Sequence, residues 1–139
     1  MERSLVLIKP DAMRRGLAGT IIARLEQPGL KMVAIKMLHL DKATAQELYS
    51  VHEGKPFFND LVDYISSAPI IAAVFQGEQT IEVIRKTMGA TDPAKAEAGT
   101  IRGDFGLDIG RNSVHGSDSM ETAQKEIKLC FSEGDIFDY

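Results

Sequence analysis

Ser4-Leu5-Val6-Leu7-Ile8-Lys9 is a continuous run of strand-forming apolar residues that ends in a lysine. A strand with one face in water alternates apolar and polar residues, whereas an unbroken apolar run indicates a strand that is buried on both faces. We therefore expect this stretch to lie in the middle of a sheet, with the rest of the chain arranged around it.

The spacing of apolar residues predicts the other elements of the fold. Proline and glycine residues separate these elements, and Asp41 is suited to cap the start of one helix. The predicted strands cover residues 4–9, 30–40 and 70–75, with a short one around Val114. The predicted helices cover residues 17–25, 42–51, 57–65 and 81–88, and a last one begins just after Ser117 or Asp118.

This order of elements contains the β-α-β-β-α-β unit, with an extra helical hairpin between the second and third strands. It predicts an α+β fold, in which a ferredoxin-like antiparallel four-stranded sheet carries helices on one face, with additional helices. A length of 139 residues suits a single domain over residues 1–139. Residues 90–111 lack periodicity, so we expect a long loop there that is either functional or disordered.

Composition narrows the class of protein. The chain has 16 Lys and Arg against 20 Asp and Glu, and this net charge of −4 argues against a nucleic acid partner. It has neither a signal peptide pattern nor the roughly 20 apolar residues of a spanning helix, so we expect a cytoplasmic protein without a membrane partner. One cysteine, Cys130, excludes an internal disulfide framework, and its apolar neighbours predict a packing role.

One histidine lies in an unusual setting, Asn112-Ser113-Val114-His115-Gly116-Ser117-Asp118-Ser119. The first amides of a helix carry free N–H donors and partial positive charge, so the helix expected after Ser117 or Asp118 attracts anions. An imidazole beside such a helix start could accept a phosphoryl group from a docked anion and pass it on. The alternative is a surface histidine in a Gly/Ser turn.

Several residues elsewhere in the chain suit an anionic ligand. Lys9 ends the buried first strand, Arg85 lies late in a helix, and Thr91 and Arg102 flank or occupy the long loop. Each of these residues alone also suits a solvated charge or a turn hydroxyl. Together with His115 they could form the cationic pocket that a polyphosphate needs.

Familiar nucleotide and metal motifs are missing. Val33-Ala34-Ile35-Lys36 and Asp104-Phe105-Gly106 match strings of protein kinases, but the glycine-rich loop and the His-Arg-Asp loop of those enzymes are absent. Neither G-x-x-x-x-G-K-[ST] nor G-x-G-x-x-G occurs. His39, His52 and His115 do not have the spacing of metal ligands, so no protein-held metal site is expected.

Longer strings resemble one known family. Thr100-Ile101-Arg102-Gly103-Asp104-Phe105, followed by the string from Asn112 to Ser119, resembles the signature of nucleoside diphosphate kinases. Leu7-Ile8-Lys9-Pro10-Asp11, Lys55-Pro56-Phe57-Phe58 and residues 89–94 match the same family in the same order. The resemblance runs without gaps from about Ser4 to Phe131, and the histidine string is far more specific than a lone glycine motif.

The resemblance implies an enzyme, a nucleoside-diphosphate kinase with a ping-pong mechanism. It moves the γ-phosphoryl group of a nucleoside triphosphate, mainly ATP, onto His115 and then onto a nucleoside diphosphate, with broad base specificity. It also implies Mg²⁺ that is bound mainly through nucleotide phosphates, and a homo-oligomer that is a tetramer or a hexamer.

The resemblance also assigns roles at the site. Phe57 would lie on the base face with Leu61 beside it, and Ile109 would lie near the other side of the base. The residues implied to hold phosphates and sugar are Lys9, Arg85, Thr91, Arg102 and Asn112. The residues implied to support His115 are Tyr49, Ser117 and Glu126, and Glu126 could fix the imidazole tautomer through a hydrogen bond.

Two other hypotheses stay open. A nucleotide-sensing or RNA-binding module on the same sheet would need aromatic residues on the central strands, where this chain has mostly Leu, Val and Ile. A phosphohistidine relay to another protein would form the same adduct on His115 and would differ only in its acceptor.

Overall fold

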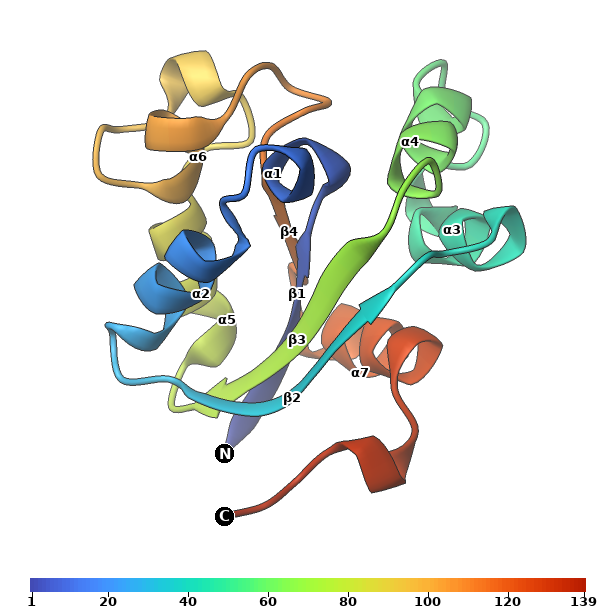
Figure 1. Ribbon diagram of the computed structural model, residues 1–139. Helices are drawn as coiled ribbons and strands as arrows, with labels where there is room; N and C mark the ends of the chain where they lie inside the picture. The colour runs from blue at the N-terminus through green and yellow to red at the C-terminus, as the bar shows by residue number, and fades with distance from the viewer.

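A four-stranded antiparallel sheet forms the centre of the computed structural model, which describes residues 1–139 (Figure 1). The strand order is β2-β3-β1-β4, so β1 lies inside the sheet between β3 and β4. Its side chains Leu5 and Leu7 are fully buried, which confirms the position expected from the apolar run. The strands are β1 (Glu2–Ile8), β2 (Lys31–Leu38), β3 (Ile70–Gly77) and β4 (Val114–Gly116).

Helices cover both faces of this sheet. In Figure 1, α2, α5 and α6 lie on one side of the strands, whereas α3, α4 and α7 lie on the other. None of them combines the length and the apolar character needed to cross a membrane. The helices are α1 (Pro10–Arg14), α2 (Ala18–Glu26), α3 (Lys42–Leu48), α4 (Phe58–Ile65), α5 (Thr80–Met88), α6 (Ile101–Phe105) and α7 (Met120–Cys130).

The α+β class and the antiparallel sheet are confirmed. The two helices of the β-α-β-β-α-β unit, α2 and α5, share one face, and the additional helices α3, α4 and α7 cover the other. The reason lies in β1, whose successive side chains point to opposite faces. Leu5 and Leu7 belong to the core cluster that also contains Leu48, Ile65 and Cys130. Val6 and Ile8 belong to a second cluster, which contains residues of α2, α5 and α6. An all-apolar strand therefore needs a covering layer on each side.

One predicted helix cap is confirmed and another is wrong. Asp41 caps α3 as expected, since its Oδ1 accepts a hydrogen bond from the Thr44 amide at 2.7 Å. The cap of α7, however, is Ser119, which accepts from the Thr122 amide at 3.1 Å, and it is neither Ser117 nor Asp118. Pro10 begins α1, because a proline at the first helical position lacks only an amide that the helix leaves unpaired.

The segment 90–111 is an ordered connection that contains two short helices. A 3₁₀ turn spans Pro93–Lys95, and α6 follows with Thr100 as its cap. Short elements of this kind escape a periodicity analysis, because a helix of five residues is too short to repeat an apolar face. Two further 3₁₀ turns span Ser50–His52 and Glu133–Asp135.

Two glycines in helices give a matched test of this packing. A Cβ at Gly103 of α6 would lie 2.0 Å from the Glu97 carbonyl oxygen, whereas one at Gly19 of α2 would meet no atom within 4 Å. Gly103→Ala should therefore destabilise the protein by about 1–3 kcal/mol through overpacking. Gly19→Ala should stabilise it by about 0.5–1 kcal/mol through helix propensity. Thermal unfolding of both variants measures this, and shifts of the same sign would contradict the packing around α6.

Candidate active site

A cleft of about 720 Å³ opens beside the end of β1, between α4, α5, α7 and the segment 89–112. The structure brings eleven of the twelve predicted site residues to its walls, although they come from distant parts of the chain. Ser117 is the exception, because it is fully buried behind the cleft wall. The residues brought together are Lys9, Tyr49, Phe57, Leu61, Arg85, Thr91, Arg102, Ile109, Asn112, His115 and Glu126.

One buried carboxylate holds the imidazole of His115. The Oε1 atom of Glu126 lies 3.0 Å from His115 Nε2 and accepts a hydrogen bond from Ser117 Oγ at 2.7 Å. Glu126 is only 3% exposed, and both hydrogen bonds fall on the same oxygen, Oε1. The ring of Tyr49 meets the imidazole edge-on, at 5.9 Å between centroids.

This geometry assigns the two ring nitrogens of His115. A carboxylate is only an acceptor, so Nε2 carries the proton and donates it to Glu126. In a neutral imidazole the other nitrogen, Nδ1, then keeps its lone pair. His115 lines the cleft, so it offers a nucleophilic nitrogen there.

Lys9 is buried in the cleft wall, at 5% exposed. Its Nζ donates to Asn112 Oδ1 at 2.8 Å, and Asn112 Nδ2 donates to the Thr91 carbonyl at 3.0 Å. Burial and the positive charge of Arg102 lower the pKa of Lys9 to about 8. The carboxylates of Asp11 and Asp108 oppose this shift without cancelling it, so the ammonium lacks a full counter-charge.

Arg102 is held by backbone carbonyls and lacks a charged partner. Its two terminal nitrogens donate to the carbonyls of Gly89 at 3.0 Å and Val114 at 2.9 Å, and its buried Nε has no partner. Burial, followed by the charge of Arg85, lowers the pKa of Arg102 to about 10. Three cations therefore lie near one another in the cleft, an arrangement that favours a polyanionic ligand.

The opposite end of the cleft offers an aromatic surface. Phe57 is 45% exposed, and the ring of His52 lies against it at 5.3 Å between centroids. Burial and the charge of Lys55 lower the pKa of His52, which favours its neutral, ring-stacking form. Ile109, from the segment 89–112, is 60% exposed and also lines the cleft.

Sequence reasoning missed two features of this site. His52 lines the cleft together with Tyr64 and Arg111, and its place between Tyr49 and Phe57 in sequence was the available signal. Ser113 has a positive φ of 76° and a fully buried hydroxyl without a partner. A serine in this strained conformation carries no sequence signal, because glycine and asparagine are the residues that normally mark it.

The hydrogen bond between Glu126 and His115 predicts the tautomer of the imidazole. When the imidazole of His115 is neutral, its ¹⁵N chemical shifts should show a proton on Nε2 only. Glu126→Leu removes the acceptor and should give a mixture of tautomers, whereas Glu126→Gln keeps an acceptor oxygen and serves as the control. A proton on Nδ1 in the unmodified protein would contradict this arrangement.

Comparison with known proteins agrees with these observations. The sequence model described as nucleoside diphosphate kinase matches residues 2–136. A nucleoside diphosphate kinase of Methanothermobacter thermautotrophicus is 58% identical over 139 residues, which is 100% of this chain and 93% of that protein. One from Dehalococcoides mccartyi is 55% identical, over 100% of this chain and 98% of that protein.

Solved structures are similar over nearly the whole chain as well. The nucleoside diphosphate kinase of Aquifex aeolicus superposes with a TM-score of 0.95 at 43% identity, covering 98% of this chain and 99% of that one. A halophilic one from Halobacterium salinarum, solved in complex with CDP, gives 0.96 at 46% identity, covering 99% and 92%. A match of this length in both sequence and structure shows that the chain belongs to the nucleoside diphosphate kinase family.

Proposed function

We propose that the chain transfers the γ-phosphoryl group of a nucleoside triphosphate, mainly ATP, to a nucleoside diphosphate through a phosphohistidine at His115. The observation that carries this proposal is the Glu126 carboxylate on Nε2, which leaves the Nδ1 lone pair available in a cleft with three cations. Because one cleft serves donor and acceptor in turn, the mechanism is ping-pong.

In the first half-reaction, the Nδ1 lone pair of His115 attacks the γ-phosphorus. The bond from that phosphorus to the bridging oxygen breaks, and the nucleoside diphosphate leaves with the electron pair. Glu126 stabilises the positive charge that develops on the imidazole, while Ser117 keeps the carboxylate in place. The second half-reaction reverses these steps with another nucleoside diphosphate.

The cations supply what phosphoryl transfer demands most, which is positioning and charge neutralisation. Lys9, Arg85 and Arg102 would hold the phosphate oxygens, and the lowered pKa values of Lys9 and Arg102, caused by burial and by neighbouring cations, support that role. Thr91 and Asn112 would hold phosphate or sugar oxygens beside them.

The aromatic end of the cleft suits the base. Phe57 would stack on one face of the base with Leu61 beside it, and Ile109 would cover the other side. Stacking is weakly selective, because every base presents a π-face, so broad base specificity follows. The CDP bound to the similar Halobacterium salinarum protein supports a nucleotide in this cleft.

We propose that magnesium binds together with the nucleotide. The chain has no group of three His, Cys, Asp or Glu side chains that could hold a metal ion. The ion would therefore be held chiefly by phosphate oxygens and water, as magnesium prefers in nucleotide sites. When bound, it would neutralise part of the phosphate charge.

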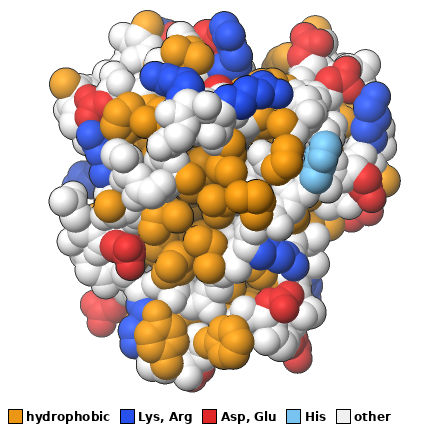
Figure 2. Space-filling model, viewed as in Figure 1, with side chains coloured by type: hydrophobic (Ala, Val, Ile, Leu, Met, Phe, Trp, Pro, Cys, Tyr) orange, Lys and Arg blue, Asp and Glu red, His pale blue; other side chains and the backbone are white.

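The proposal includes a homo-oligomer, a tetramer or a hexamer, of single-domain chains over residues 1–139 in the cytoplasm. The exposed edge strand β2 supports the oligomer, since Ile35 and Met37 are 46% and 64% exposed there. Figure 2 shows apolar side chains gathered across this side of the molecule. An unpaired edge of this kind is normally covered in soluble proteins.

The alternative of an RNA-binding module receives no support from the fold. Such a module needs aromatic residues on an open sheet face. Here helices cover both faces, and the single aromatic residue of β3, Phe75, is fully buried.

Phosphorylation of His115 can be tested by intact mass. Incubation with ATP and magnesium should add the mass of one phosphoryl group in an acid-labile form, and GDP should remove it. His115→Ala should abolish the adduct, whereas His39→Ala, at an exposed histidine away from the cleft, should keep it. A wild-type protein that stays unlabelled contradicts the proposal, and an adduct that resists every nucleoside diphosphate favours a protein relay.

The pKa of Lys9 predicts proton uptake when a nucleotide binds. Near pH 8 about half of the free protein carries a proton on Lys9, because its pKa is about 8. A bound polyphosphate favours the charged form and raises that pKa, so binding should take up roughly half a proton. Calorimetry in buffers of different ionisation enthalpy measures this uptake.

Lys9→Gln is the matched variant for this measurement. It should bind nucleotide more weakly and take up no proton at the same pH. Arg102 titrates near pH 10 and contributes little there. Equal uptake by both proteins would show that Lys9 does not contact the phosphates.

A further inference from the structure

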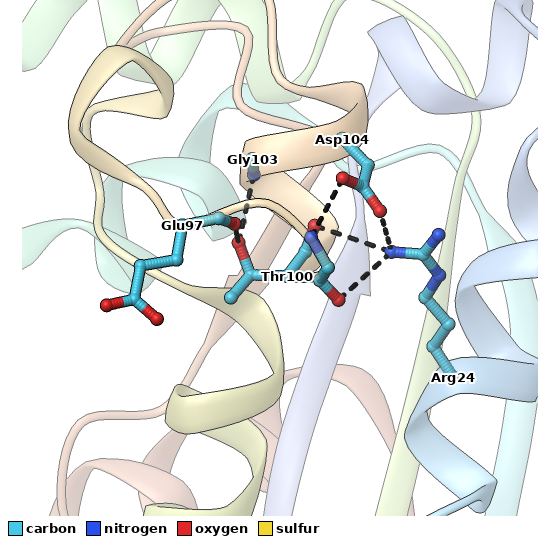
Figure 3. A network of polar contacts seen from close by, with 6 residues as sticks. Arg24, Glu97, Thr100, Gly103 and Asp104 are labelled. Atoms are coloured by element: carbon cyan, nitrogen blue, oxygen red, sulfur yellow. Dashed lines mark hydrogen bonds and ion pairs between the residues drawn. The ribbon is translucent and has the colours of Figure 1, made fainter.

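Arg24 lies on α2, outside the cleft, and grips the segment that leads into α6. Its terminal nitrogen donates to Asp104 Oδ2 at 2.6 Å and lies 3.3 and 3.4 Å from the carbonyl oxygens of Gly99 and Thr100 (Figure 3). The guanidinium also lies over the ring of Phe105, at 4.6 Å from its centroid. One side chain therefore contacts both the start and the end of α6.

The same segment is closed by bonds among its own residues. Asp104 Oδ1 accepts from the Gly99 amide at 3.0 Å. Thr100 Oγ1 donates to the Glu97 carbonyl at 2.6 Å and accepts from the Gly103 amide at 3.1 Å (Figure 3). Asp104 thus joins this turn to Arg24, and its carboxylate has a lowered pKa because of the Gly99 amide and Arg24.

Helix α6 needs such support. It has five residues, and isolated helices of that length do not form in water. Arg102 lies in its second position, so the direction in which its side chain enters the cleft is set by the backbone of α6. The partners of that side chain, the Gly89 and Val114 carbonyls, belong to other segments, so both bonds depend on where α6 lies relative to them.

We propose that Arg24 is a positioning residue for Arg102: from outside the cleft it fixes the turn before α6, and so holds the Arg102 guanidinium where it meets the ligand. Arg24 does not line the cleft and touches no reacting atom. The kinetic part of this inference rests on the proposed function, whereas its structural part can be read without turnover.

The pKa of Lys9 reports the position of Arg102 without any measurement of turnover. The charge of Arg102 helps to lower the pKa of Lys9, with burial as the larger cause and Asp11 and Asp108 as opposing charges. If Arg102 moves away, the pKa of Lys9 must rise above about 8. A substitution that only weakens the fold would leave that pKa unchanged in the folded protein.

The experiment compares Arg24→Ala with Lys86→Ala, a control at an exposed residue of the neighbouring helix α5. An NMR titration of the Lys9 Nζ group gives its pKa, and rapid mixing with ATP gives the rate of His115 phosphorylation. Arg24→Ala should raise the Lys9 pKa and slow phosphorylation roughly ten- to a hundredfold, the order expected for a misplacement of up to an ångström. The control should match the unmodified protein in both.

Arg24→Lys tests an intermediate loss of the Arg24 contacts. A lysine keeps a charge for Asp104 but lacks the planar guanidinium that stacks on Phe105, so its rate should fall between those of Arg24→Ala and the unmodified protein. If Arg24→Ala does not fold, Asp104→Asn takes its place, because it removes the partner charge at equal size.

An unchanged Lys9 pKa overturns the inference, whether or not the rate or the melting temperature falls. An unphosphorylated wild type instead defeats the proposed function, and the Lys9 titration of Arg24→Ala still decides whether Arg24 positions Arg102. A raised Lys9 pKa together with a slowed phosphorylation supports the inference.

Discussion

A buried carboxylate that accepts two hydrogen bonds organises the site. Glu126 is almost fully removed from water, and an ionised carboxylate in that position is tolerated only when its oxygens are satisfied. Its Oε1 is satisfied by Ser117 and His115, one from the link after β4 and one from β4 itself. The carboxylate in turn depends on α7 packing against β1, so the chemistry at the imidazole is tied to the central strand of the fold.

The cations of the cleft are placed at some cost to the folded chain. Lys9 and Arg102 are buried without a carboxylate in direct contact. Burial and the charge of a neighbouring arginine therefore lower the pKa of each. A fold selected only for stability would pair these groups with acids. The backbone of Ser113, in the same segment, is also in an unfavourable conformation, with a positive φ. Strain of this kind persists only where the surroundings enforce it. The site thus stores electrostatic strain that a polyanion relieves.

The sequence predicted the parts of the fold that depend on local patterns. The apolar run of β1 predicted a central strand, and Asp41 predicted a helix start, because both signals act over a few residues. The burial of β1 on both faces was predicted as well, but which helices form each covering layer was not, since that depends on packing between distant parts of the chain. The true cap Ser119 was missed for a related reason: Ser117 and Asp118 are equally good caps by type, but Ser117 is engaged by Glu126.

The candidate site shows the same division. Physical reasoning on the residues reached a cationic pocket around His115, while the assignment of individual roles came from the resemblance to a family. The structure adds two contacts that neither source predicted. Arg24 binds the segment 89–112 from outside the cleft, and Nε2 of His115, not Nδ1, faces Glu126. Long-range contacts of this kind join residues far apart in the chain, so no local pattern records them.

The central claim is that the Nδ1 atom of His115 carries the phosphoryl group. NMR of the phosphorylated protein, with ³¹P and ¹⁵N observed together, identifies the nitrogen that bonds to phosphorus. We expect a phosphorus–nitrogen coupling to Nδ1 of His115, with the Nε2 proton still donated to Glu126. Phosphorus on Nε2, or on any other side chain, would contradict it.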